Sequence, residues 1–286
     1  MLTLIFVQTV ANGGFFLLAA RLARYTGNST YVDWAAKEWE WFTTSQLFNG
    51  TTYAVNDGMT IMNKQCPEAD HTQWSYNYGL MLGGLAFLYN HTEDTKWLTP
   101  LGGMLNRTLA EFFPASMGDK IMVEAACEPY GTCDTNGWTF KSFVIRWMAL
   151  TAQLVPDLAS TIWPYIQASG QGAAGQCDGG TDSVTCGFRW NSTIWDGTYG
   201  VGQQMSALSA IQANLITVSN LRAPYTADTG GTSPGDPSAG TGTGDVDPNQ
   251  PGIYTRRIGT ADKAGAGILT ALALIMTLGG TWFILK

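Results

Sequence analysis

The C-terminal end of the chain limits what the rest can fold into. Residues 264–285 carry no charge and run for 22 residues, long enough for a helix to cross a bilayer. Residues 226–262 before them are rich in Gly, Ser, Thr and Pro, which is typical of a disordered, flexible stalk that buries nothing. A folded domain must therefore be built from the remaining residues, about 225, which suffice for one large domain.

The residues around position 260 suggest how this end is used. Small and polar residues at 259–263 precede the apolar run, and this order is the pattern of a GPI attachment signal. A single-pass transmembrane helix is the alternative for residues 263–286. Both interpretations predict a membrane partner through the C-terminus and a location at the cell surface.

Glycosylation motifs and cysteines agree with export. Cys127 and Cys133 are six residues apart and Cys177 and Cys186 nine apart, each pair in polar loop sequence, so we expect two small disulfide loops. Cys66 is left without a partner. Five Asn-x-Ser/Thr motifs are present, and they are candidate glycosylation sites. They lie at Asn28, Asn49, Asn90, Asn106 and Asn191.

Charge and composition exclude several classes of function. The net charge is −7 and only 13 % of residues are charged, so no basic surface exists for nucleic acid. The chain has no Cys-x-x-Cys motif and only two histidines, His71 and His91, so we expect no metal site. No phosphate-binding loop or dinucleotide motif occurs, and we expect no cofactor.

Helical periodicity dominates the remaining sequence, and alternating β patterns are nearly absent. Aromatic residues recur at helical spacing, and glycines at 79, 83 and 84 would permit close approach of a neighbouring helix. Residues 1–10 form an atypical N-terminus, compatible with a minimal signal sequence or a misassigned start. Residues 56–67 are expected to form a loop. The seven predicted helices are 12–25, 30–42, 72–89, 95–113, 138–154, 157–168 and 203–221.

Seven antiparallel helices rich in Trp and Tyr indicate an all-α toroid rather than a four-helix bundle. Aromatic faces with Asn, Asp and Gln in the rim loops suit carbohydrate. Glycoside hydrolysis normally needs two carboxylates around the scissile bond. The adjacent pair Glu93 and Asp94 is better explained by helix capping, and the loop residues Asp57 and Glu124 have no partner identifiable from spacing.

Several runs carry a resemblance to a known family. The chain resembles fungal glycoside hydrolase family 76, of the GPI-anchored mannan endo-1,6-α-mannosidase type, over about residues 11–286. The matching runs are NGGFFLLAARLARYTGNSTYVDWAAKEWEW from residue 12, NDG from 56, QWSYNYG from 73, FKSFVIRW from 140, CGFRW from 186, YGVGQQMSAL from 199 and DKAGAGILTAL from 262.

The resemblance implies a fold, a substrate and a site. The fold would be an (α/α)6 toroid, of which residues 11–225 supply about seven of twelve helices. The substrate would be α-1,6-linked mannan or the mannose core of a GPI glycan, facing the cell wall. The sugar-binding groove would be formed by Asn56, Asp57, Trp74, Tyr76 and Asn77. The alternatives for these positions are loop capping and core packing.

The resemblance also implies that the catalytic residues of the family are missing from this chain. The family's catalytic groups are two consecutive aspartates, and this sequence contains no such pair. We therefore expect the chain to lack hydrolase activity by itself. Family members tend to carry Cys at the position of Gly14, which would explain the unpaired Cys66. A non-catalytic mannan-binding surface protein and a truncated gene model are the alternative interpretations.

Overall fold

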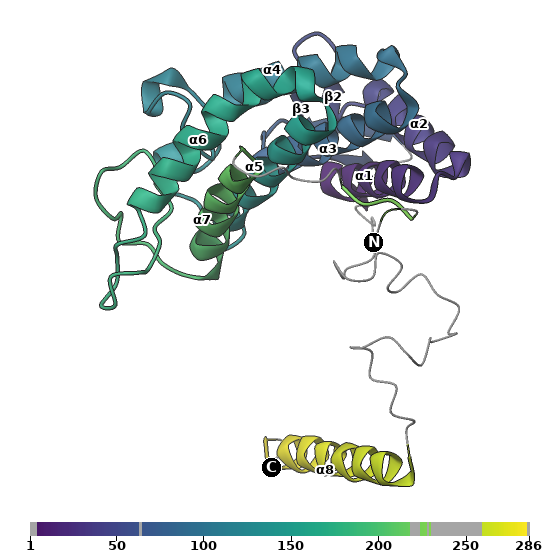
Figure 1. Ribbon diagram of the computed structural model, residues 1–286, viewed down its shortest axis with the longest axis vertical. Coiled ribbons are helices and arrows are strands. Elements are labelled where there is room, and N and C mark those ends of the chain that lie inside the picture. The colour runs from purple at the N-terminus through teal and green to yellow at the C-terminus, as the bar shows by residue number, and fades with distance from the viewer. Residues whose placement is uncertain (1–4, 63–64, 218–223, 228, 230–258, 285–286) are drawn as a thin grey trace. The chain divides into compact units, whose positions relative to one another are not determined.

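The computed structural model describes residues 5–62, 65–217, 224–227, 229 and 259–284. The chain divides into two compact units, residues 1–230 and 231–286. In the first unit, α1, α3, α5 and α7 pack side by side in one row, and α2, α4 and α6 pack behind that row (Figure 1). This arrangement is part of an α/α toroid, as the sequence predicted.

The seven predicted helices of this unit are present, but two end elsewhere than predicted: the helix predicted at 157–168 continues to Gly175, and the helix predicted at 203–221 ends at Ala213, before a 3-10 turn at Asn214–Thr217. The expected helix at 95–113 begins as a 3-10 turn, Thr95–Trp97, and Pro164 lies inside α6 without ending it. Residues 218–221 of the last predicted helix lie outside the described residues. The observed helices are α1 (Thr9–Thr26), α2 (Ser29–Thr44), α3 (Ser75–Thr92), α4 (Leu98–Phe112), α5 (Gly137–Leu154), α6 (Ala159–Gly175) and α7 (Val201–Ala213).

Local sequence explains where the first helices meet. Gly27 ends α1 in the left-handed conformation, at φ 69°. Asn28 then caps α2, because its side-chain oxygen accepts a hydrogen bond from the backbone N–H of Thr30. The chain therefore reverses direction within two residues, and α1 and α2 pack as a hairpin.

Glycines set the spacing of the inner row, as predicted. A Cβ at Gly84 would lie 2.2 Å from the Phe16 ring on α1, and a Cβ at Gly79 would lie 3.0 Å from the backbone of Val144 on α5. Only glycine allows α3 to approach both neighbours this closely. Helix α3 is therefore the centre of the unit, and 12 of its 18 residues are buried.

The unit is mostly helical, as predicted, but the structure corrects the expectation of a loop at residues 56–67. Residues expected to form a loop build a small antiparallel sheet in the order β1 (Ile5–Gln8), β4 (Gly58–Met62) and β5 (Gln65–Asp70). A two-residue pair, β2 (Phe48–Asn49) with β3 (Ala54–Val55), precedes it. Residues 5–8, which we assigned to the atypical N-terminus, are thus one strand of this sheet.

Two expectations fall mainly outside the described residues. Most of the stalk, residues 230–258, is not described, and neither is the side chain of Cys66 within β5. The second unit contains α8 (Thr260–Ile284). None of the helices in the described part of the chain combines the length and the apolar character needed to cross a membrane.

Candidate functional site

The N-terminal end of α3 gathers most of the predicted site residues. The Asp57 carboxylate accepts hydrogen bonds from the Tyr76 hydroxyl at 2.8 Å and from the Asn77 side-chain amide at 3.0 Å. Backbone bonds hold Asp57 itself: its N–H donates to Asp70, and its carbonyl accepts from Thr9 at the start of α1. The sheet thus fixes a carboxylate against the first turn of α3.

An aromatic cluster lies beside this carboxylate. The Phe140 ring of α5 lies 4.3 Å from the Tyr76 ring and 5.3 Å from the Trp74 ring, measured between centroids. Tyr76, Phe140 and Asn136 help to line a cavity of about 370 Å3 between the first turns of α1, α3 and α5. We call this cavity the groove. Phe140 was missed as a site residue, because inside an apolar helix it is indistinguishable from core.

Tyr76 remains a neutral hydroxyl in this setting. Burial raises the pKa of its phenol far above the ordinary value, and the neighbouring Asp57 carboxylate raises it further. Its proton is committed to Asp57, so the ring rather than the hydroxyl is available to the groove. Apolar rings with a fixed carboxylate nearby suit the face and the hydroxyls of a sugar.

Of the five predicted groove residues, only Tyr76 lines this cavity. Asn56 has a different role. Its side-chain amide donates to the carbonyl of Gln46 at 2.7 Å, and its side-chain oxygen lies 3.2 Å from the His71 ring. The residue is almost fully buried. It therefore organises the loop before β4, which matches the loop-capping alternative.

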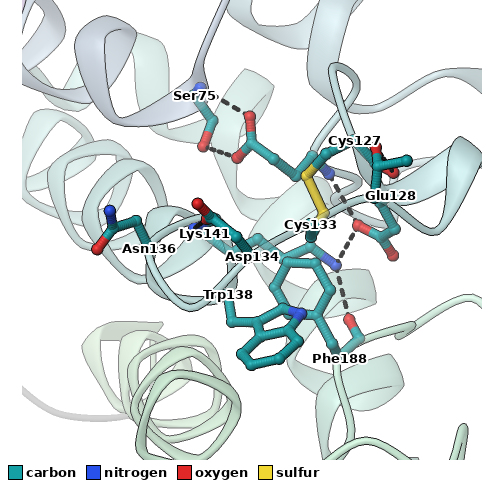
Figure 2. The surroundings of a disulfide bond; sticks show 12 residues. Ser75, Cys127, Glu128, Cys133, Asp134, Asn136, Trp138, Lys141 and Phe188 are labelled. Atoms are coloured by element: carbon teal, nitrogen blue, oxygen red, sulfur yellow. Dashed lines mark hydrogen bonds and ion pairs between the residues drawn. A yellow bond between two sulfur atoms is a disulfide. The ribbon is translucent and has the colours of Figure 1, made fainter.

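A buried polar network supports the groove from behind. Glu124 is fully buried and accepts hydrogen bonds from both the backbone N–H and the hydroxyl of Ser75, the first residue of α3 (Figure 2). Burial raises the pKa of this carboxyl to about 8. Because no side chain of α3 caps its own N-terminus, Glu124 does so from a distant loop.

The same network contains a buried ion pair. The Glu128 carboxylate lies 2.7 Å from the Lys141 ammonium and accepts from the backbone N–H of Glu124 at 2.8 Å. Lys141 also donates to the carbonyl of Phe188 at 2.8 Å. Burial lowers the pKa of Lys141, and Glu128 opposes that shift. The network joins α3, α5 and residue 188. The spacing of these residues in the sequence did not predict that they would interact.

Both predicted disulfides are present in the structure, joining Cys127 to Cys133 and Cys177 to Cys186. The first closes the loop that carries Glu128 (Figure 2). Among the described residues, no group of three or more His, Cys, Asp or Glu side chains could hold a metal ion.

The candidate glycosylation sites are not equivalent. Four of the five side chains are exposed, whereas Asn90 is partly buried at the end of α3. Its amide nitrogen donates to the carbonyl of Leu154 at 2.9 Å, and its oxygen accepts from Arg24 at 2.6 Å. Asn90 therefore joins the C-terminal ends of α1, α3 and α5. The exposed sites are Asn28, Asn49, Asn106 and Asn191.

We expect the folded, secreted chain to carry glycans at the exposed sites and little or none at Asn90. A glycan on its amide would crowd the contacts that hold three helix ends together. Glycopeptide mass spectrometry after expression in a secretory host measures occupancy at each site. Asn106→Gln, the matched control, should remove one glycan from the intact mass, and Asn90→Gln should remove none. Full occupancy at Asn90 would contradict the expectation.

Comparison with known proteins places this arrangement in a family. Residues 5–228 match the model of glycosyl hydrolase family 76. The chain is 45% identical over 284 residues to mannan endo-1,6-alpha-mannosidase DCW1 of Candida albicans, covering 97% of this chain and 60% of that protein. It is 44% identical over 266 residues to DCW1 of Saccharomyces cerevisiae, covering 93% and 56%. The chain thus spans somewhat more than half the length of these relatives.

Solved structures agree. The crystal structure of Dfg5 from Chaetomium thermophilum in complex with glucosamine matches with a TM-score of 0.73 and 39% identity, covering 82% of this chain and 56% of that one. An α-1,6-mannanase of Salegentibacter, in complex with α-1,6-mannotetrose, shares the fold with a TM-score of 0.61 and 16% identity, covering 74% and 60%. That protein is a variant with two consecutive aspartates replaced, and it is described as inactive. By its sequence and by its fold, the chain belongs to glycosyl hydrolase family 76.

Proposed function

We propose that this chain binds α-1,6-linked mannose in the groove, as part of a cell-wall glycosidase or transglycosidase of the mannan endo-1,6-α-mannosidase type. The observation that carries the proposal is the Asp57 carboxylate, fixed by Tyr76 and Asn77 beside the rings of Trp74 and Phe140. The family membership supports the substrate class, because the curated relatives are named for action on α-1,6-mannan. The mannose core of a GPI glycan offers the same sugar chemistry.

The chemistry of cleavage is a separate matter from binding. The chain has no two consecutive aspartates, and a mannanase of the same fold is described as inactive when two such residues are replaced. We therefore propose that the chain on its own binds mannan without hydrolysing it. A non-catalytic mannan-binding surface protein is the second candidate function, and this same observation favours it.

The C-terminal segment supports a location at the cell surface. The uncharged run at 264–285, preceded by small residues and a long Gly/Ser/Thr/Pro-rich stretch, fits GPI attachment. An anchored domain with exposed glycosylation motifs would face the cell wall, where mannan is found.

Replacing Asp57 by alanine should weaken the binding of α-1,6-mannotetraose about tenfold, because Tyr76 and Asn77 lose the acceptor that orders them. Isothermal titration calorimetry measures the affinity, and a reducing-end assay on the same samples measures hydrolysis. Asp33→Ala, on the exposed face of α2, is the matched control and should bind as the wild type does. Reducing ends released by the wild-type chain would refute binding without hydrolysis, and an unchanged affinity in Asp57→Ala would refute the proposed site.

A further inference from the structure

The carboxyl group of Glu124 is connected to the groove through a single residue of α3. Ser75 donates its backbone N–H to Oε1 of Glu124 at 3.0 Å, and its hydroxyl contacts Oε2. The next two residues are Tyr76 and Asn77, whose hydroxyl and amide both donate to Oδ1 of Asp57. One helical turn therefore carries the Glu124 contact on its first residue and the groove contacts on the two that follow.

The segment that presents Glu124 is fixed by its own backbone. Helix α6, the end of α4 and the disulfide loop 127–133 each bind one of three consecutive N–H groups. Met122 donates to the hydroxyl of Ser169 at 3.0 Å, Val123 to the carbonyl of Phe112 at 2.8 Å, and Glu124 to the carboxylate of Glu128 at 2.8 Å. A capping group on such a fixed support can orient the helix that it meets.

The charges around Glu124 balance only while its carboxyl is neutral. Lys141 of α5 and Glu128 form an ion pair at 2.7 Å, and both side chains are buried. Burial raises the pKa of Glu124 to about 8, although the Lys141 ammonium opposes the shift. Loss of the Glu124 proton leaves an unpaired negative charge in the interior, and movement of the carboxylate into water relieves it.

Three neighbouring groups also titrate. Burial and the Asp57 carboxylate raise the pKa of Tyr76 far above its ordinary value, so its phenol stays neutral. Burial would raise the pKa of Asp196, but hydrogen bonds to its carboxylate outweigh burial and lower that pKa, so Asp196 stays ionised. Burial lowers the pKa of Lys141. Lys141 is therefore the rival to Glu124 as the group that loses a proton near neutral pH.

We propose that Glu124 is a positioning residue of the groove, which holds the first turn of α3 in its sugar-binding arrangement only while its carboxyl is protonated. Loss of that proton to solvent releases the carboxylate from Ser75, and Tyr76 and Asn77 then lose their fixed position against Asp57. The affinity for saccharide therefore falls as the pH rises through the value at which Glu124 ionises. The inference rests on the proposed function for its ligand and adds a pH dependence to it.

The pH profile of binding provides the test. The full chain is titrated with α-1,6-mannotetraose by calorimetry between about pH 6 and about pH 8.5, and circular dichroism at each pH checks that it is folded. If only the protonated form binds, the wild type should bind about fourfold more weakly at the upper pH, where about a quarter of the molecules keep the Glu124 proton. Glu124→Gln does not titrate and should show no such fall.

Ser75→Ala gives a second, independent measurement. The hydrogen bond from the Ser75 hydroxyl lowers the pKa of Glu124, so its removal should move the fall in affinity to higher pH. Glu38→Gln, on α2, is the matched control, because it removes another carboxyl whose pKa is raised by burial. This variant should keep the pH profile of the wild type.

The possible failures are distinguishable. A wild-type affinity that does not change with pH rejects the inference, while the proposed function stands. A fall that persists in Glu124→Gln assigns the titration to another group, such as Lys141, and also rejects it. If Glu124→Gln does not fold, Ser75→Ala decides alone, and an unmoved pH profile in that variant rejects the inference. If the wild type does not bind the tetraose at any pH, the proposed function fails and the inference fails with it.

Discussion

Replacing Lys141 by methionine will lower the free energy of unfolding by about 3–5 kcal/mol. The substitution keeps most of the side-chain volume but leaves the Glu128 carboxylate buried without its cation, which is the costly way to break a buried ion pair. The neighbouring carbonyl of Phe188 also loses its donor. Urea unfolding followed by tryptophan fluorescence measures the change.

The double variant Glu128→Gln/Lys141→Met is the control for this result. It removes both charges, so most of the stability should return even though the ion pair is gone. A loss below about 1 kcal/mol in Lys141→Met would mean that Glu128 becomes protonated or hydrated at little cost.

Raising the pH from about 5 to about 8 should destabilise the wild-type chain through Glu124. Its carboxyl has a pKa of about 8 in the folded state, against an ordinary value of 4.5. Between those values the folded chain keeps a proton that the unfolded chain releases. Stability is therefore fully present below the unfolded pKa and is lost as the pH rises towards 8. The slope approaches about 1.4 kcal/mol per pH unit.

Glu124→Gln isolates this effect, because an amide resembles the protonated carboxyl and does not titrate. The difference in unfolding free energy between wild type and variant cancels the titrating groups that do not interact with Glu124, including Glu38, whose pKa is also raised by burial. We expect the variant to gain stability relative to the wild type as the pH rises from 5 to 8. A difference that stays constant with pH would show that Glu124 is ionised in the folded chain throughout.

The helices were predictable because each carries its own signal. The glycines of α3 and the Gly27–Asn28 junction between α1 and α2 encode packing and ends locally. The sheet of β1, β4 and β5 was missed since its strands lack alternation, and Pro67 within β5 argues for a loop. Its pairing depends on contacts between residues about 50 positions apart.

The candidate site likewise contains some residues that the sequence predicted and others that it did not. Asp57, Tyr76 and Asn77 were found through their resemblance to family motifs, whereas spacing alone gave no reason to join them. Glu124 looked like an ordinary loop carboxylate, which normally remains in water. Its burial depends on the hydrogen bonds from Ser75, which lies 49 positions earlier in the sequence. Only the fold brings the two residues together.

The contacts of Arg24 have a mechanical consequence. Arg24 donates to Asn90 and also to the carbonyls of Pro224 and Tyr225, while Ala227 donates to the carbonyl of Tyr25. The departing polypeptide is thus fastened to the C-terminal ends of the inner helices, whereas the groove lies at their N-terminal ends. A pulling force applied at the C-terminus would load these hydrogen bonds before the rest of the unit.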